Sequence, residues 1–159
     1  MLLYGSETWP LRKEDLRRLT VFDHRCLKSI ARIWWDHRIS NAEVRRRALG
    51  RHARTIDELM SLHRLRWLGH VLRMPAERLP KRALFAQPCA GWKRPKGGQS
   101  VTWQRNMKAL TDRLNRVGNC RLPGWGPRDK PSQWLETLTD MAQSRSQWRS
   151  CIHAIAFNA

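Results

Sequence analysis

Long apolar runs are missing from this sequence, and its cysteines are few and widely spaced. No stretch approaches the roughly 18 apolar residues of a membrane-spanning helix. The first residues are too short and not basic enough for a secretory signal, so we expect none. Cys26, Cys89, Cys120 and Cys151 lack the close pairing of a zinc or redox motif, which predicts reduced thiols. These absences together predict a nuclear or cytoplasmic protein.

Acidic side chains are also scarce, with 13 Asp and Glu against 31 Lys and Arg, for a net charge of +18. Repulsion on this scale weakens a compact state unless a polyanion neutralises it. Arginine carries most of the excess, and its guanidinium matches phosphate oxygens bidentately. We therefore expect a nucleic-acid partner, RNA or DNA, rather than a membrane surface. Residues 41–100 hold the largest share of the excess charge, so the contact surface is expected there.

The clearest amphipathic segment lies near the N-terminus. Thr8 suits a helix N-cap, and Pro10 suits a first turn. At the helical period one stripe is apolar, formed by Leu16, Leu19, Phe22, Cys26, Leu27, Ile30, Ile33 and Trp34. The opposite face is basic and consists of Arg17, Arg18, Arg25, Lys28 and Arg32. Acidic partners at i,i+4 are mostly missing, so this face is a candidate phosphate-contacting surface, with a merely solvated face as the alternative.

Two capping boxes follow, at residues 40–43 and 55–58. The first predicts a short helix that ends at Gly50, a suitable C′ residue. That helix carries most of the densest cation cluster, which consists of Arg45, Arg46 and Arg47 with Arg51 and Arg54. Phosphate contact and a nuclear-import signal both fit this cluster. The second box predicts a longer helix over about residues 56–74, apolar on two sides and therefore central.

The C-terminal half combines loops with helices. Residues 78–85 predict a short strand or turn, and residues 88–100 a basic Pro/Gly linker. Ser100 or Thr102 then caps a helix that reaches Gly118, and residues 119–132 form a second loop. Helices are predicted over 133–143 and 146–157. The sequence predicts a mainly α fold, with a domain over 1–87, the linker over 88–100 and a smaller extension over 101–159.

The aromatic and histidine side chains allow more than one interpretation. Trp34, Trp67, Trp103 and Trp148 lie on apolar helix faces, which favours core packing over base stacking. Trp92 differs because Lys93, Arg94 and Lys96 accompany it in the linker, which makes this group a candidate for base stacking and phosphate contact. His63 and His70 are too far apart on a helix to share a metal ion, and Gly69 is expected to allow close helix packing.

Several strings resemble one family when they are taken together in this order. They are residues 2–9 (LLYGSETW), Phe22-x3-Cys26-Leu-x2-Ile30, Trp35-Asp36 followed by Ile39-Ser-Asn41, residues 64–75 (RLRWLGHVLRMP) and residues 134–149 (WLETLTDMAQSRSQWR). This pattern resembles the part of LINE-type non-LTR retrotransposon reverse transcriptases that follows the polymerase palm. The segment around Trp67 and His70 is the most specific, and the resemblance covers nearly the whole chain.

The resemblance implies a parent RNA-directed DNA polymerase that uses Mg²⁺. It also implies a helical thumb-like bundle over residues 10–74 and a C-terminal helical extension over 101–159, which grip the template and primer. The Tyr-x-Asp-Asp signature of the palm is absent from this sequence, and so is an endonuclease motif. Without that carboxylate cluster the two metal ions have no ligands. We therefore expect no catalytic residues, no metal site and no cofactor in this chain.

Three functional hypotheses follow from the sequence. The first is a nucleic-acid-binding fragment that holds template and primer phosphates. The second is a reverse transcriptase or nuclease still active as this chain, for which the sequence contains no local signature. The third is a non-functional relic of a truncated element, which the position of Met1 directly before the first family string makes plausible. A stand-alone basic helical protein that binds DNA or RNA is a further alternative, and the oligomeric state is left open.

Overall fold

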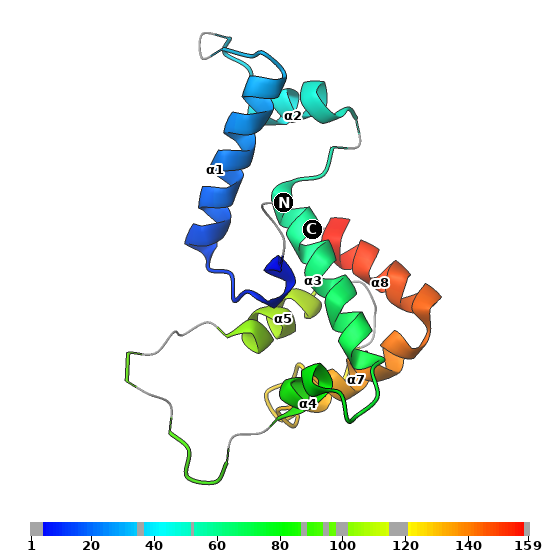
Figure 1. Cartoon of the computed structure of the whole chain (residues 1–159). Helices are drawn as coiled ribbons and strands as arrows, with labels where there is room; N and C mark the ends of the chain where they lie inside the picture. The colour runs from blue at the N-terminus through cyan, green and yellow to red at the C-terminus, as the bar shows by residue number, and fades with distance from the viewer. Residues whose placement is uncertain are drawn as a thin grey trace. The chain divides into compact units, whose positions relative to one another are not determined.

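The computed structural model describes residues 5–34, 37–51, 53–86, 89–93, 96–97, 102–114 and 121–157. Within this part the chain is mainly α and contains no β-strand, which confirms the predicted fold class. The elements are η1 (Ser6–Thr8), α1 (Lys13–Ile30), α2 (Asn41–Leu49), α3 (Ile56–Leu72), α4 (Leu79–Phe85), α5 (Trp103–Thr111), α7 (Gln133–Gln143) and α8 (Arg145–Phe157) (Figure 1). No helix in the described ranges is long and apolar enough to cross a membrane.

The chain forms two compact units. The small unit comprises Leu11–Met60, and the large unit comprises Met1–Pro10 together with Ser61–Ala159. This division differs from the boundary predicted at residues 88–100. Leu84 precedes that segment and Met107 follows it, and both belong to one hydrophobic core in the large unit.

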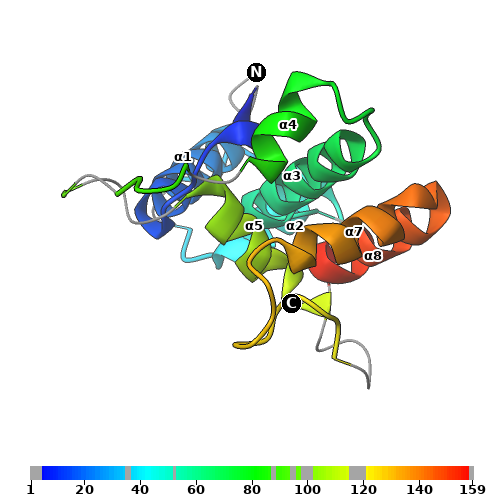
Figure 2. The ribbon, with the colours of Figure 1, turned by 90° about the horizontal axis from the view of Figure 1, so that it is seen from below.

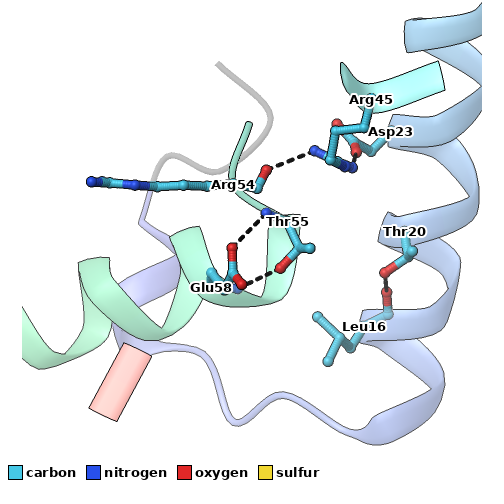
Figure 3. A network of polar contacts seen from close by, with 7 residues as sticks. All are labelled: Leu16, Thr20, Asp23, Arg45, Arg54, Thr55 and Glu58. Carbon is cyan, nitrogen blue, oxygen red and sulfur yellow. Dashed lines mark hydrogen bonds and ion pairs between the residues drawn. The ribbon is translucent and has the colours of Figure 1, made fainter. Parts of the chain in front are cut away.

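In the small unit α1 packs against α2 (Figure 1). Leu27 of α1, Val44 of α2 and Ile33 of the connection form its buried core. Helix α2 ends at Gly50 as predicted, since the Gly50 N–H donates to the Arg46 carbonyl. The box at residues 55–58 also forms as predicted, because Thr55 and Glu58 each bond the other's backbone N–H (Figure 3).

Both ends of α1 differ from the prediction. The helix begins at Lys13 rather than near Thr8, because the Asp15 carboxylate accepts the Arg12 N–H and Thr8 instead ends η1. It stops at Ile30, where Arg32 takes a left-handed conformation (φ 52°) and the Ile33 N–H donates to the Lys28 carbonyl. Trp34 therefore lies beyond the helix.

The apolar stripe predicted for α1 is only partly buried. Phe22 is 51% exposed, Ile30 is 70% exposed, and Trp34 is also 70% exposed, whereas Leu27 and Ile33 are buried. The prediction that Trp34 packs in a core is therefore wrong. Of the eight residues of the stripe, only Leu27 and Ile33 belong to the buried core of the small unit.

In the large unit α3 is central, as predicted. Its residues Leu62, Leu65, Leu68, Val71 and Leu72 are all buried in the core of that unit. Helices α7 and α8 pack side by side (Figure 2) and contribute several core residues, among them Trp134, Leu138, Trp148, Ile152 and Ile155. This core explains why α3 is apolar on two sides.

Close packing at Gly69 joins α3 to α8. A Cβ built on Gly69 would lie 2.0 Å from Nε1 of Trp148, so only glycine fits there. The same indole N–H donates to the Leu65 carbonyl at 3.2 Å. Both observations confirm the packing role expected for Gly69. Trp67 and Trp103 also pack against the core, in an edge-to-face pair with ring centroids 5.3 Å apart.

The strand or turn predicted at residues 78–85 is instead the helix α4, in which Pro80 occupies the first turn. Thr102 caps α5 as predicted, because its hydroxyl accepts the Arg105 N–H. Helix α5 ends at Thr111, earlier than predicted, and Val117 and Gly118 lie outside the described residues. Helix α7 matches its predicted range, and α8 begins one residue earlier than expected.

Candidate nucleic-acid interface

Five of the predicted binding residues line one hollow of about 930 Å³ in the small unit. We call it the basic groove. The cations that line it are Arg25 and Lys28 of α1, Arg45 and Arg46 of α2, and Arg51 after α2. Asp57 is the only carboxylate among the residues that line this groove. Helices α1 and α2 and the loop after α2 thus place positively charged side chains around a single depression.

Arg45 joins the two helices that form the groove (Figure 3). Its guanidinium pairs with the Asp23 carboxylate of α1 and donates to the Arg54 carbonyl at 2.7 Å. The Arg45 side chain is 14% exposed and the Asp23 side chain 25%. Arg45 therefore fixes the groove wall, and its charge is largely compensated.

Arg46 and Arg47 share one carboxylate. Both donate to Glu43 at 2.8 Å, and these bonds lower the pKa of Glu43 to about 2. The Ser40 hydroxyl accepts the Glu43 N–H, so half of the predicted capping box is present. The Glu43 carboxylate faces its own helix instead of completing the box.

The uncompensated charge in the groove comes from Arg25, Lys28 and Arg51. None of the three makes an ion pair among the residues that the structure describes. Burial is the main cause of a lowered pKa at His24, and the nearby cations Lys28 and Arg45 lower it further, with Asp23 opposing.

The remaining candidates of α1 do not line the groove. Arg17 is exposed on the helix, and Arg18 pairs with Glu14 at 3.2 Å. Arg32 is exposed at the left-handed residue after the helix, so its placement on the helical face was wrong. The basic face predicted for α1 is therefore divided, and only Arg25 and Lys28 lie in the groove.

The aromatic group predicted in the linker belongs to the large unit. Trp92 is 61% exposed, and Lys93 and Lys96 are exposed as well. Arg94 lies outside the described residues. Base stacking at Trp92 stays a prediction.

His63 and His70 are not brought together at a metal site. Within the described ranges no group of three His, Cys, Asp or Glu side chains is placed to hold a metal ion. Cys26, Cys89 and Cys151 are free thiols, and Cys120 lies outside the described part.

Sequence reasoning missed a second group of cations. Arg66, Arg73, Arg78, Arg145 and Arg149 line two adjoining hollows in the large unit. The only signal in the sequence was spacing, since Arg66 and Arg73 are seven residues apart and Arg145 and Arg149 four.

Comparison of the chain with family models, curated proteins and solved structures found no significant match. The interpretation of the site therefore rests on its residues and their geometry.

Proposed function

We propose that this chain binds nucleic acid by holding backbone phosphates in the basic groove. The observation that carries the proposal is that Arg25, Lys28 and Arg51, which make no ion pair among the described residues, line one depression together with Arg45 and Arg46. Guanidinium groups match phosphate oxygens in charge and in geometry. Contacts of this kind position a strand without reading its sequence.

The resemblance to LINE-type reverse transcriptases supports a more specific form of the proposal. In that form the chain is the post-palm part of a retrotransposon polymerase and grips its template and primer. We propose no catalytic role for this chain, because its sequence lacks the Tyr-x-Asp-Asp motif that would hold the Mg²⁺ ions of the parent enzyme.

A charge-reversal experiment tests the proposal. The complete chain and the double variant Arg25→Glu/Lys28→Glu are titrated with a labelled RNA–DNA hybrid in filter-binding assays over a range of salt. We expect the double variant to lose about tenfold or more in affinity, because each charged hydrogen bond contributes at least about 1.5 kcal/mol. The log–log salt slope should fall by about 1.4–1.8 if two phosphate contacts are lost.

Lys13→Glu/Arg38→Glu is the matched control. Both residues are exposed in the small unit, lie outside the groove lining and give the same change in net charge. This control should keep most of the affinity, since long-range attraction is the only contribution it alters. Equal losses in the two double variants would mean that net charge alone governs binding. Wild-type affinity that does not change with salt would contradict phosphate contact altogether.

A further inference from the structure

Two adjoining depressions in the large unit form a second basic site, which we call the arginine hollow. They measure about 500 and about 470 Å³ and share Arg73 and Arg145. The first depression is completed by Arg66 and Arg149, over Trp148 and Ile152. The second is completed by Arg78 and His70, with Met74, Pro75 and Pro80. Neither lining contains a carboxylate.

Helix α8 packs closely on α3 (Figure 1), and these two helices carry the arginines of the first depression or lie next to them in the chain. Arg66 belongs to α3, and Arg73 follows its last residue. Arg145 and Arg149 lie one turn apart at the start of α8, where the helix N-terminus adds a partial positive charge. Only glycine at position 69 allows α8 to approach so closely, so the packing itself gathers these arginines.

The base of the hollow is held in place by hydrogen bonds. Trp148 is buried and donates to the Leu65 carbonyl at 3.2 Å. Nη1 of Arg73 donates to the Ala142 carbonyl at 3.2 Å. A ligand would thus meet groups that are already positioned, which reduces the entropy lost on binding.

The charges of the hollow are uncompensated. Among the described residues none of its five arginines makes an ion pair with a carboxylate. The pKa of Arg73 is lowered by burial and by the nearby Arg145 guanidinium. Like charges held side by side raise the free energy of the unbound state, and an anion between them would relieve that repulsion.

We propose that the arginine hollow binds successive phosphates along a nucleic-acid strand and is a second grip separate from the basic groove. The choice of a strand rests on the proposed function. It also follows from the shape, because two depressions that share two arginines offer more than one phosphate position along a continuous path. Guanidinium forks supply the paired donors that phosphate oxygens accept.

The test uses the complete chain and a short, labelled single-stranded RNA, with affinity measured by fluorescence anisotropy at several salt concentrations. We expect Arg66→Glu/Arg149→Glu to lose about tenfold or more in affinity and to lower the salt slope by about 0.7 for each lost contact. Arg82→Glu/Arg128→Glu is the matched control, since both arginines are exposed in the large unit and outside the hollow. Equal losses in the two pairs would overturn the proposal.

Two further measurements separate the sources of the effect. Arg66→Gln/Arg149→Gln removes the charges without reversing them. This variant should still bind RNA more weakly than the control. Circular dichroism shows whether each variant keeps its helices. Calorimetry with inorganic pyrophosphate tests a free anion. If the hollow variants lose pyrophosphate binding but bind RNA as the control does, the hollow serves a free anion and the strand proposal is wrong.

The groove variant Arg25→Glu/Lys28→Glu is measured in the same assay. If the wild-type chain binds no RNA, the proposed function fails and this inference fails with it. If the groove variant weakens binding and the hollow variants match their control, only the second grip is disproved. If the groove variant and the hollow variants each bind RNA more weakly than their own control variants, two separate sites are supported.

Discussion

Gly69 and Trp148 form a contact that leaves no room for a larger side chain at position 69. The indole lies where a Cβ would be placed, and its N–H bonds a carbonyl of the facing helix one turn away. Glycine in a helix ordinarily costs about 1 kcal/mol relative to alanine. At this position the close approach of two helices outweighs that cost.

We therefore predict that Gly69→Ala destabilises the chain although it raises helix propensity. A Cβ 2.0 Å from the Trp148 ring forces α8 to shift, and overpacking of this kind costs about 1–3 kcal/mol. Urea unfolding followed by circular dichroism measures the change in the free energy of unfolding. A gain in stability, as at an open helical glycine, would show that the two helices do not pack this closely.

The residue scale also shows where local chemistry suffices and where it does not. Thr55 and Glu58 satisfy each other's backbone groups within one turn, so their roles could be predicted from spacing alone. Glu43 has the same spacing from Ser40 but bonds Arg46 and Arg47, because those guanidiniums compete for its carboxylate. The spacing of residues therefore predicts which hydrogen bonds a side chain can make, but nearby charged side chains determine which of them forms.

At the scale of elements, the small unit depends on one side chain that spans two helices. Arg45 reaches from α2 to Asp23 on α1 and to the Arg54 carbonyl before α3 (Figure 3). The hydrophobic core beneath is small, with Leu27, Ile33 and Val44 as its buried members. The bond from Arg45 to Asp23 therefore adds a polar link to the small apolar contact between α1 and α2.

We predict that Arg45→Met destabilises the small unit by about 1.5–3 kcal/mol, the usual loss for hydrogen bonds to a charged group. Arg46→Met is the control, because Arg46 is mostly exposed and pairs only within its own helix. Its effect on stability should be much smaller. Hydrogen exchange of the α1 and α2 amides measures local stability, and similar exchange in both variants would argue against the bridging role.

The ends of the elements explain which predictions failed. Helix α1 stops just before Arg32, which is left-handed, and glycine is the usual residue at such a place; nothing in the residues therefore predicts an end before Trp34. Pro80 suggested a break, yet it occupies the first turn of α4, where proline costs no hydrogen bond. The central role of α3 was predictable because apolar residues on two sides require neighbours on both.

At the scale of the whole molecule, the sequence predicts the excess of positive charge but does not predict which arginines lie together in space. Composition alone indicated an anionic partner, and the spacing on α1 singled out Arg25 and Lys28. Which arginines share a depression depends on how helices distant in sequence pack, as with Arg73 and Arg145 in the hollow. No periodicity within one helix contains that information.

A net charge of +18 predicts that salt acts in opposite directions on folding and on binding. Screening weakens the repulsion among the arginines, so the Tm of the free chain should rise with sodium chloride. A gain of about 1 kcal/mol would raise the Tm by about 2–4 °C. Calorimetric scans at low and high salt measure this effect, and a Tm that falls as salt is added would contradict it.

Glu43 competes with any incoming anion for one of the guanidinium groups of the basic groove. Its carboxylate already satisfies Arg46, so an incoming anion gains that guanidinium only by displacing an internal competitor. The hydrogen bonds from Arg46 and Arg47 lower the pKa of Glu43 to about 2, so this competing carboxylate is charged at neutral pH. In the proposed function, a strand held at Arg25 and Lys28 would bring its next phosphate to Arg46 at high local concentration, an advantage that a single small anion lacks. A groove that works as proposed would therefore favour polymers over small anions.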